Sequence, residues 1–272
     1  MKQAIFATVL LGSILLASSF LLTPRQVRDI EKKNAEYIDL QAERAHLPRG
    51  SGSTANPVQG IANATSGYLE VNADTGARLF YVFYSARNLA AGQQPTDVPV
   101  IIWLQGGPGA SSELGNFYEL GPYGLVFDQS TGEYKEQRRD RSWNDDYNIL
   151  IIDNPRGVGY SQAAGSYVSD ENQVAADFVQ AMINFYNLDA FTGYQNTPLF
   201  VFGESYGGHY VPSVSKGILE YNENPTNITI PIKGCGVGDG WTDPINQLAN
   251  YDLFAFSLGL VDYAGKLTVQ VQ

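Results

Sequence analysis

Two kinds of apolar pattern follow one another along the chain. Residues 67–71 and 78–84 are rich in β-forming side chains and flank a turn-forming run at 72–76, which predicts an antiparallel hairpin. Three later stretches are continuously apolar, without alternation: residues 98–104, 148–152 and 199–202. Continuous apolar strands are typical of parallel sheets that are covered on both faces. The pattern therefore predicts a mostly parallel sheet preceded by an antiparallel hairpin.

Two segments have helical periodicity. Residues 171–188 place five apolar side chains on one helical face: Val174, Phe178, Ala181, Met182 and Phe185. Residues 208–221 give a second helical stretch, directly after the last of the apolar strands. Strands thus alternate with helices, which is the order of an α/β fold.

The N-terminal part of the chain differs from the rest. Lys2 precedes an apolar run at 4–16 that ends in small residues, so we interpret residues 1–19 as a secretory signal peptide. The run is shorter than the roughly 20 residues that a bilayer span requires, so no stable membrane anchor is expected. Residues 20–55 are interpreted as a charged extension or pro-segment ending in a Ser- and Gly-containing linker, with an ordinary first helix of the domain as the alternative. The main domain is placed at 56–272.

Composition and charge narrow the classes of function. The 272 residues carry 28 acidic and 17 basic side chains, a formal charge of −11, which would repel nucleic acids and anionic lipid head groups. A hydrophobic content of 44% excludes general disorder. Sequons at Asn63 and Asn227 are candidate glycosylation sites and agree with secretion. Cys235 is the single cysteine, so no disulfide forms within this sequence, and nothing indicates an oligomeric state.

The most informative motif is Gly-Glu-Ser-Tyr-Gly at 203–207, which follows an apolar strand and precedes a helix. Glycines two residues on either side of the serine allow a sharp turn that exposes its hydroxyl at a helix N-terminus, where negative charge is stabilised. We therefore expect Ser205 to be a catalytic nucleophile. The alternative is a glycine-rich turn in which the serine only caps the helix.

A second glycine cluster, Gln-Gly-Gly-Pro-Gly at 105–109, follows the strand that ends at Leu104. Small residues at this position let backbone N–H groups approach a developing oxyanion, so Gly107 and Tyr206 are the expected oxyanion-hole donors. A phosphate-binding loop is the alternative, but the sequence has neither G-x-x-x-x-G-K-[ST] nor a spaced G-x-G-x-x-G with a later acidic residue. No nucleotide or other cofactor is expected.

Five sequence blocks occur in a characteristic order. They are WLQGGPGASS at 103–112, ELGP at 119–122, DNPRGVGYS at 153–161, GESYGG at 203–208 and GDGWTDP at 238–244. Together they resemble the serine carboxypeptidase family, which has the α/β-hydrolase fold. The glutamine in the first block and the Asp-Asn-Pro of the third are most similar to the vitellogenic and retinoid-inducible branch.

The resemblance implies a function. Ser205 would attack the last peptide carbonyl of a peptide or protein substrate, forming an acyl-enzyme. The substrate's terminal carboxylate would lie in a pocket formed by Trp103, Gln105, Gly106, Glu119 and Glu204. Because the two glutamates and the substrate carboxylate cannot all ionise at low cost, one glutamate should hold a proton, which favours an acidic working pH. An extracellular or a lysosome- or vacuole-like compartment fits this, and no metal is implied.

The resemblance also shows what this sequence lacks, because the family's triad Asp and His follow the serine later in the chain. Its histidines are His46, in the charged extension, and His209, expected to point away from Ser205; Asp153 and Asp243 are interpreted as structural. We therefore expect this sequence to be the N-terminal portion of such a domain. It would be truncated at its C-terminus and inactive as given. Ala110, where many members have cysteine, and the unpaired Cys235 agree with this. A secreted binding or chaperone-like relative and a serine carboxypeptidase-like acyltransferase remain alternatives.

Overall fold

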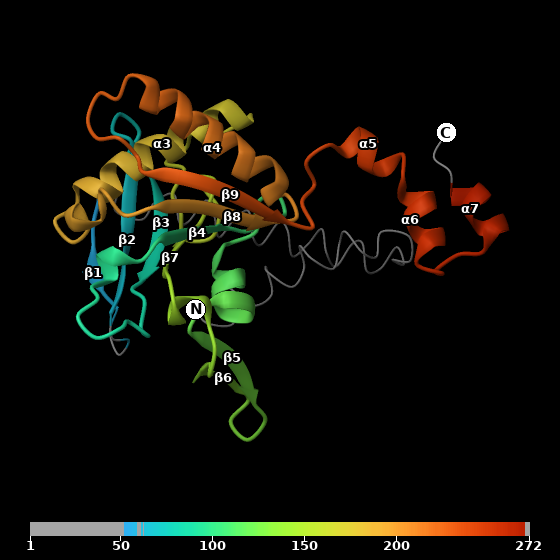
Figure 1. Ribbon diagram of the computed structural model, residues 1–272, viewed down its shortest axis with the longest axis horizontal. Coiled ribbons are helices and arrows are strands. Elements are labelled where there is room, and N and C mark those ends of the chain that lie inside the picture. The colour runs from blue at the N-terminus through green and yellow to red at the C-terminus, as the bar shows by residue number, and fades with distance from the viewer. Residues whose placement is uncertain (1–51, 59–60, 62, 270–272) are drawn as a thin grey trace.

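The computed structural model of the chain describes residues 52–58, 61 and 63–269 (Figure 1). The predicted signal peptide at 1–19, most of the predicted extension at 20–55, and His46 lie outside the described residues.

A central sheet organises the described part of the chain. Its strands lie in the order β1-β2-β3-β7-β4-β8-β9. They are β1 Asn56–Pro57, β2 Ala64–Asn72, β3 Ala77–Tyr84, β4 Val100–Leu104, β7 Asn148–Ile152, β8 Leu199–Glu204 and β9 Ile232–Gly238. The first three strands and the β3–β7 pair are antiparallel, whereas β7, β4, β8 and β9 run parallel. The predicted hairpin, the mostly parallel sheet and the α/β class are confirmed.

Two long helices cover one face of this sheet (Figure 1). Helix α3 spans Glu171–Asn187 and connects β7 to β8, and α4 spans Gly207–Glu223 and connects β8 to β9. The Asp170 carboxylate caps α3 by accepting hydrogen bonds from the backbone N–H groups of Asn172 and Gln173, at 2.9 and 3.0 Å. Both helices lie where the 3.6-residue periodicity predicts them.

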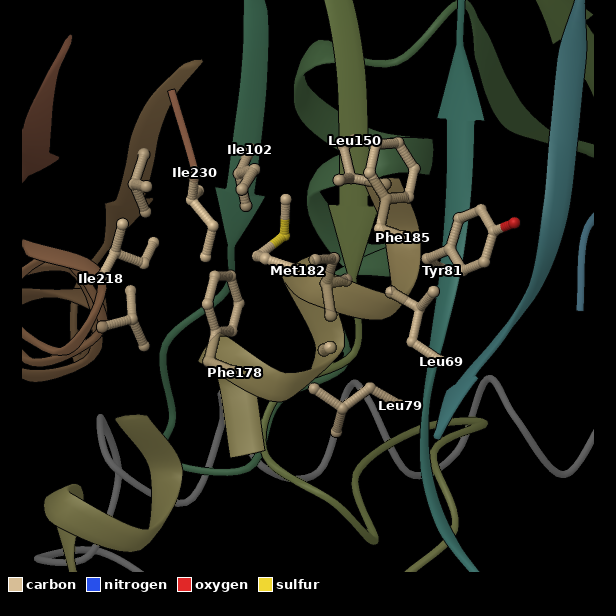
Figure 2. Packing of buried hydrophobic residues seen from close by; sticks show 14 of the residues in the cluster. Leu69, Leu79, Tyr81, Ile102, Leu150, Phe178, Met182, Phe185, Ile218 and Ile230 are labelled. Atoms are coloured by element: carbon tan, nitrogen blue, oxygen red, sulfur yellow. The ribbon is translucent and has the colours of Figure 1, made fainter. Parts of the chain in front are cut away.

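The main core lies between α3, α4 and the sheet. Phe178, Met182 and Phe185 project from α3 and are fully buried. Figure 2 shows these three side chains packed among residues from the strands, α4 and the segment before β9, namely Leu69, Leu79, Tyr81, Ile102, Leu150, Ile218 and Ile230. A smaller cluster on the opposite face contains the alternate side chains of β4 and β7, including Trp103, Ile149 and Ile151. Strands β4 and β7 are thus covered on both faces, as their pattern predicts, whereas alternate residues of β8 are only partly buried.

Short elements fill the connections. They are the 3₁₀ turns η1 Pro95–Asp97, η3 Trp143–Asp145 and η4 Thr192–Tyr194, the π-helix η2 Gly115–Leu120, and a separate hairpin of β5 Tyr123–Asp128 and β6 Glu133–Arg138. The β5–β6 hairpin projects from the body of the molecule (Figure 1). Because η2 follows the loop after β4, it brings Glu119 towards the carboxyl ends of the parallel strands.

The residues expected to form a linker lie along the sheet. Thr54 N–H donates to the Tyr68 carbonyl at 2.8 Å, and Gly52 N–H donates to the Glu70 carboxylate at 2.8 Å. A side chain at Gly67 would meet the Thr54 carbonyl oxygen at 2.0 Å, so this contact requires glycine. Residues 52–57 are therefore attached to β2.

Three short helices follow β9: α5 Pro244–Leu248, α6 Tyr251–Ser257 and α7 Tyr263–Val269. They extend away from the sheet (Figure 1), and their large apolar side chains are exposed, for example Phe254 at 62% and Tyr263 at 66%. Among the described residues, no helix combines the length and the apolar character that crossing a membrane would demand.

Candidate active site

Ser205 occupies a sharp turn between β8 and α4. Its φ of +56° lies in the left-handed region, which residues other than glycine adopt rarely. Backbone hydrogen bonds hold this conformation: Ser205 N–H donates to the Gly238 carbonyl at 3.1 Å, and the Ser205 carbonyl accepts from Trp241 N–H at 2.7 Å. The residue is exposed. The hydroxyl is thus presented to solvent at the start of a helix, as the sequence motif predicts.

The glycine loop after β4 lies directly against this turn. A Cβ at Gly106 would be 2.7 Å from both Ser205 Cβ and the Tyr206 nitrogen, so the approach is possible only for glycine. Gly107 follows with a φ of +115°. The N–H groups of Gly107 and Tyr206 donate no hydrogen bond to any other described residue. Two unpaired amide donors close to an exposed serine suit the stabilisation of an oxyanion.

A hydrogen-bonded cluster links the ends of β4 and β8 to η2. The Trp103 indole N–H donates to Gln105 Oε1 at 2.9 Å, which orients the Gln105 amide. The amide nitrogen then donates to Glu204, and more weakly to Glu119 at 3.5 Å. Four predicted pocket side chains are thereby joined in one cluster, and Gly106 lies against the serine itself.

Glu119 has a raised pKa in this cluster. Desolvation, together with the neighbouring Glu204 carboxylate, raises the pKa of Glu119 to about 7. A protonated Glu119 donates a hydrogen bond to Glu204, which also raises this pKa, whereas the bond from Gln105 lowers it. Below about pH 7 the Glu119 carboxyl group is therefore mostly protonated and uncharged.

Asp153, the residue after β7, holds the segment that follows the glycine loop. Its carboxylate accepts hydrogen bonds from Ser111 Oγ at 2.6 Å and from the N–H groups of Ser112 and Tyr160, both at 2.8 Å. Burial, and then the nearby Asp153, raise the pKa of Glu113. Asp153 therefore fixes the loop that leads to η2, which agrees with the structural role expected of it.

His209 does not serve Ser205 in this structure. Its ring stacks on Tyr206 with centroids 4.5 Å apart and an interplanar angle of 6°. Nδ1 of His209 is buried and forms no hydrogen bond with other described residues. His209 is the histidine within the described ranges, and it forms no hydrogen bond with the Ser205 hydroxyl. His46 lies outside these ranges. That His209 points away from the serine hydroxyl stays a prediction.

The remaining candidate residues lie apart from this site. Asp243 caps α5, accepting from Asn246 N–H at 3.3 Å. Asn63 and Asn227 are exposed, which leaves both sequons accessible, although their glycosylation stays a prediction. Cys235 is an exposed free thiol on β9. Among the residues that the structure covers, no group of three or more His, Cys, Asp and Glu side chains could hold a metal ion.

The fold and the serine turn together define a class of protein. A mostly parallel sheet with a G-x-S-x-G serine between strand and helix is the arrangement of the α/β-hydrolases. The family model for serine carboxypeptidases matches residues 57–271, and the chain belongs to this family.

Individual relatives agree with the family. The chain is 38% identical to serine carboxypeptidase-like 50 of Arabidopsis thaliana, over 75% of this chain and 44% of the relative. It is 39% identical to the venom serine carboxypeptidase of Apis mellifera, over 74% and 40%, and 36% identical to the probable serine carboxypeptidase CPVL of Homo sapiens, over 81% and 44%. CPVL represents the vitellogenic-like branch. The chain therefore spans less than half the length of these relatives.

A solved structure is also similar. The prohormone-processing carboxypeptidase Kex1 of Saccharomyces cerevisiae superimposes with a TM-score of 0.64 at 28% sequence identity, covering 74% of this chain and 43% of that chain. The likeness supports the α/β-hydrolase assignment of the described sheet.

Residues that sequence reasoning missed lie around Tyr206. Trp241 belongs to the last of the five blocks, but its backbone bond to the Ser205 carbonyl was not expected. Glu171 was assigned only to a helix, yet it lies close enough to Tyr206 for each side chain to influence the pKa of the other. No local pattern links these residues to the serine, because their contacts arise from the packing of α3 and of the segment after β9 against the start of α4.

Proposed function

We propose that the protein is a serine-type carboxypeptidase that releases C-terminal amino acids through an acyl-enzyme on Ser205. The observation that carries the proposal is the cluster of Gln105, Glu119 and Glu204 beside an exposed serine. An amide donor and a protonated carboxyl group are suited to a substrate carboxylate. The selection of a free C-terminus would follow from this cluster, because an internal peptide segment offers it no carboxylate.

The proposed chemistry uses the described residues in defined roles. Ser205 Oγ forms a bond to the last peptide carbonyl carbon, the C–N bond breaks, and the terminal amino acid leaves. The N–H groups of Gly107 and Tyr206 would stabilise the oxyanion. Water then attacks the ester and regenerates the serine. The serine proton requires a general base, and none of the described residues offers one, so we expect a protein limited to these 272 residues to react slowly.

The location proposed for the enzyme is the secretory pathway, ending outside the cell or in an acidic compartment. The predicted signal peptide and the two exposed sequons support this. The raised pKa of Glu119 supports an acidic compartment, because the carboxyl is then protonated when the substrate carboxylate arrives.

A covalent probe and product analysis test the proposal in the full-length protein. A fluorophosphonate should label Ser205, and a peptide with a free C-terminus should lose its last residue, whereas the same peptide ending in an amide should be cleaved much more slowly. Ser205→Ala is expected to abolish labelling and to reduce turnover by about four or more orders of magnitude. Labelling that persists in this variant would place the nucleophile elsewhere.

The same experiment separates the alternatives. Transfer of the acyl group to an added alcohol, in preference to water, would identify an acyltransferase. A full-length protein that neither takes up the probe nor releases amino acids would be a non-catalytic relative, and the proposal would be wrong.

Glu119→Gln gives a second test of the carboxylate pocket. As the pH rises through about 7, Glu119 should ionise in the wild type and repel the substrate carboxylate, so that KM increases. Glutamine cannot ionise, so the variant should retain part of the activity at acidic pH and should lose this neutral limb of the KM profile. Glu223→Ala, an exposed residue at the end of α4, is the control. An unchanged pH profile in Glu119→Gln would assign Glu119 to structure alone.

A further inference from the structure

Helix η2 carries Glu119, and its C-terminal turn lacks a backbone donor at one position. The Gly121 N–H group donates to the Asn116 carbonyl at 3.1 Å, five residues earlier, which is the spacing of a π-helix. With the same spacing the Phe117 carbonyl would accept from residue 122, but that residue is Pro122, which has no N–H group. The Phe117 carbonyl therefore needs a donor from outside the helix.

The Arg139 side chain supplies this donor. Its Nη2 donates to the Phe117 carbonyl at 2.6 Å, and its Nη1 donates to the Gly121 carbonyl at 3.0 Å. The backbone N–H group of Arg139 also donates to the Pro122 carbonyl, at 2.9 Å. In the sequence, Glu119 is midway between the two carbonyls that the guanidinium group binds. Arg139 thus fixes the backbone on both sides of this glutamate.

Arg139 is itself held in place, as the residue that follows β6. Its carbonyl accepts from Arg87 Nη2 at 3.2 Å, and the Arg87 side chain forms an ion pair with Asp145 of η3. The guanidinium group also lies against the main chain of β5, because a Cβ at Gly124 would be 3.4 Å from Arg139 Nε. Arg139 is partly buried, whereas the preceding Arg138 is exposed. These contacts leave the guanidinium group little freedom to move away from η2.

We infer that Arg139 is a positioning residue for substrate recognition: by holding the end of η2, it keeps the Glu119 carboxyl group in the cluster that would receive the C-terminal carboxylate of a peptide. The inference rests on the proposed function, since it takes that cluster as the carboxylate pocket. The hydrogen bond from Gln105 to Glu119 is long, at 3.5 Å, and Glu119 is exposed. The position of Glu119 therefore depends on the backbone that carries it, and a binding group loses most of its effect when its supporting contacts are lost.

Arg139 would act on binding and not on the chemical step. Its guanidinium group is bound to backbone carbonyls, and within the described part of the chain no hydrogen bond joins it to Ser205 or to the glycine loop at 105–109. Loss of Arg139 should therefore raise KM for a peptide with a free C-terminus and leave kcat nearly unchanged. The rate at which a fluorophosphonate labels Ser205 should also stay at the wild-type value, because the probe carries no carboxylate.

The test compares Arg139→Ala, Arg139→Lys, Glu119→Ala and the Arg139→Ala/Glu119→Ala double variant in the full-length protein. We expect Arg139→Ala and Glu119→Ala each to raise KM about tenfold, the order of a lost hydrogen bond to a charged group. The double variant should lie within about twofold of Glu119→Ala, because the side chain to be positioned is then absent. Arg139→Lys keeps a donor but not the planar fork that spans two carbonyls, so its KM should be intermediate.

Arg138→Ala is the matched control. Arg138 is the exposed neighbour in the sequence, and its side chain forms no hydrogen bond or ion pair with another described residue, so its KM should match the wild type. A fall in kcat with unchanged KM in Arg139→Ala, slower labelling of Ser205, or fully additive KM effects in the double variant would overturn the inference. If Arg139→Ala does not fold, Arg139→Lys, alone and combined with Glu119→Ala, carries the same comparison.

Protection of Ser205 from the fluorophosphonate separates this inference from the proposed function. A peptide with a free C-terminus should slow the labelling of the wild type more strongly than the same peptide ending in an amide. Arg139→Ala should need about ten times more of the free-acid peptide for equal protection. A wild type that is protected in this way but releases no amino acid would refute the carboxypeptidase proposal, and the protection measurements would still decide the role of Arg139. A wild type that is not labelled, or that neither peptide protects, would refute both.

Discussion

Strands β4 and β9 both pair in parallel with β8, yet their surroundings differ. Every residue of β4 is buried, because the strand has neighbours on both edges and side chains packed on both faces. In β9 the side chains of Lys233, Cys235 and Val237 are exposed. The described chain can therefore be divided into two parts. The closed part contains strands β2, β3, β7, β4 and β8 with helices α3 and α4, and the open part runs from β9 to α7. The position of a strand beside β8 does not determine its burial; the layers packed over it do.

The same difference separates the helices. Phe178 of α3 is fully buried between the sheet and α4, whereas Phe254 of α6 is 62% exposed. Both are phenylalanines on helices, so they form a matched pair. The comparison predicts that the free energy of unfolding depends on the closed part and hardly at all on the open part.

The largest expected effect tests this pair directly. Phe178→Ala should lower the free energy of unfolding by about 3–5 kcal/mol, because it removes a buried ring and leaves a cavity. Phe254→Ala should change it by less than about 0.5 kcal/mol. Urea denaturation of both variants and the wild type gives the comparison. Similar losses in the two variants would show that α6 is covered in solution and that the open part is closed there.

A smaller effect on the free energy of unfolding is expected from the two helix-capping residues. Asp170 caps α3 in the closed part, and Asp243 caps the short α5 in the open part. Asp170→Ala should cost about 1 kcal/mol of global stability, because α3 unfolds with the core. Asp243→Ala should leave the urea midpoint unchanged, since α5 contributes no buried residue to that core. A fall in the midpoint for Asp243→Ala would contradict the division into two parts.

The closed part was predictable from the sequence and the open part much less so. Strands covered on both faces require apolar side chains at successive positions, which is why β4, β7 and β8 could be located. Strand β9 escaped notice because Gly234 and Gly236 remove the apolar signal; the Phe200 and Phe202 rings of β8 lie over these glycines. The β5–β6 hairpin was missed because its second strand is exposed throughout.

The site shows the same limit. Ser205 and the glycine loop could be found because a tight turn and a close backbone approach each demand particular residues at fixed spacing. Glu119 and Glu204 were named from the resemblance, and the structure joins them through Gln105. Glu171 could not be found, because its proximity to Tyr206 depends on how α3 packs against α4, and no residue near Glu171 in the sequence carries that information.

The left-handed backbone conformation of Ser205 affects which residue natural selection would retain at this position. A side chain in the left-handed region costs about 1 kcal/mol that glycine would avoid, so the fold alone favours glycine at this position and only the chemistry favours serine. The position is therefore a trade-off between stability and activity. In a lineage that no longer needed the hydroxyl, replacement of the serine by glycine would give a more stable protein, and the residue at this single position would report which selection pressure prevails.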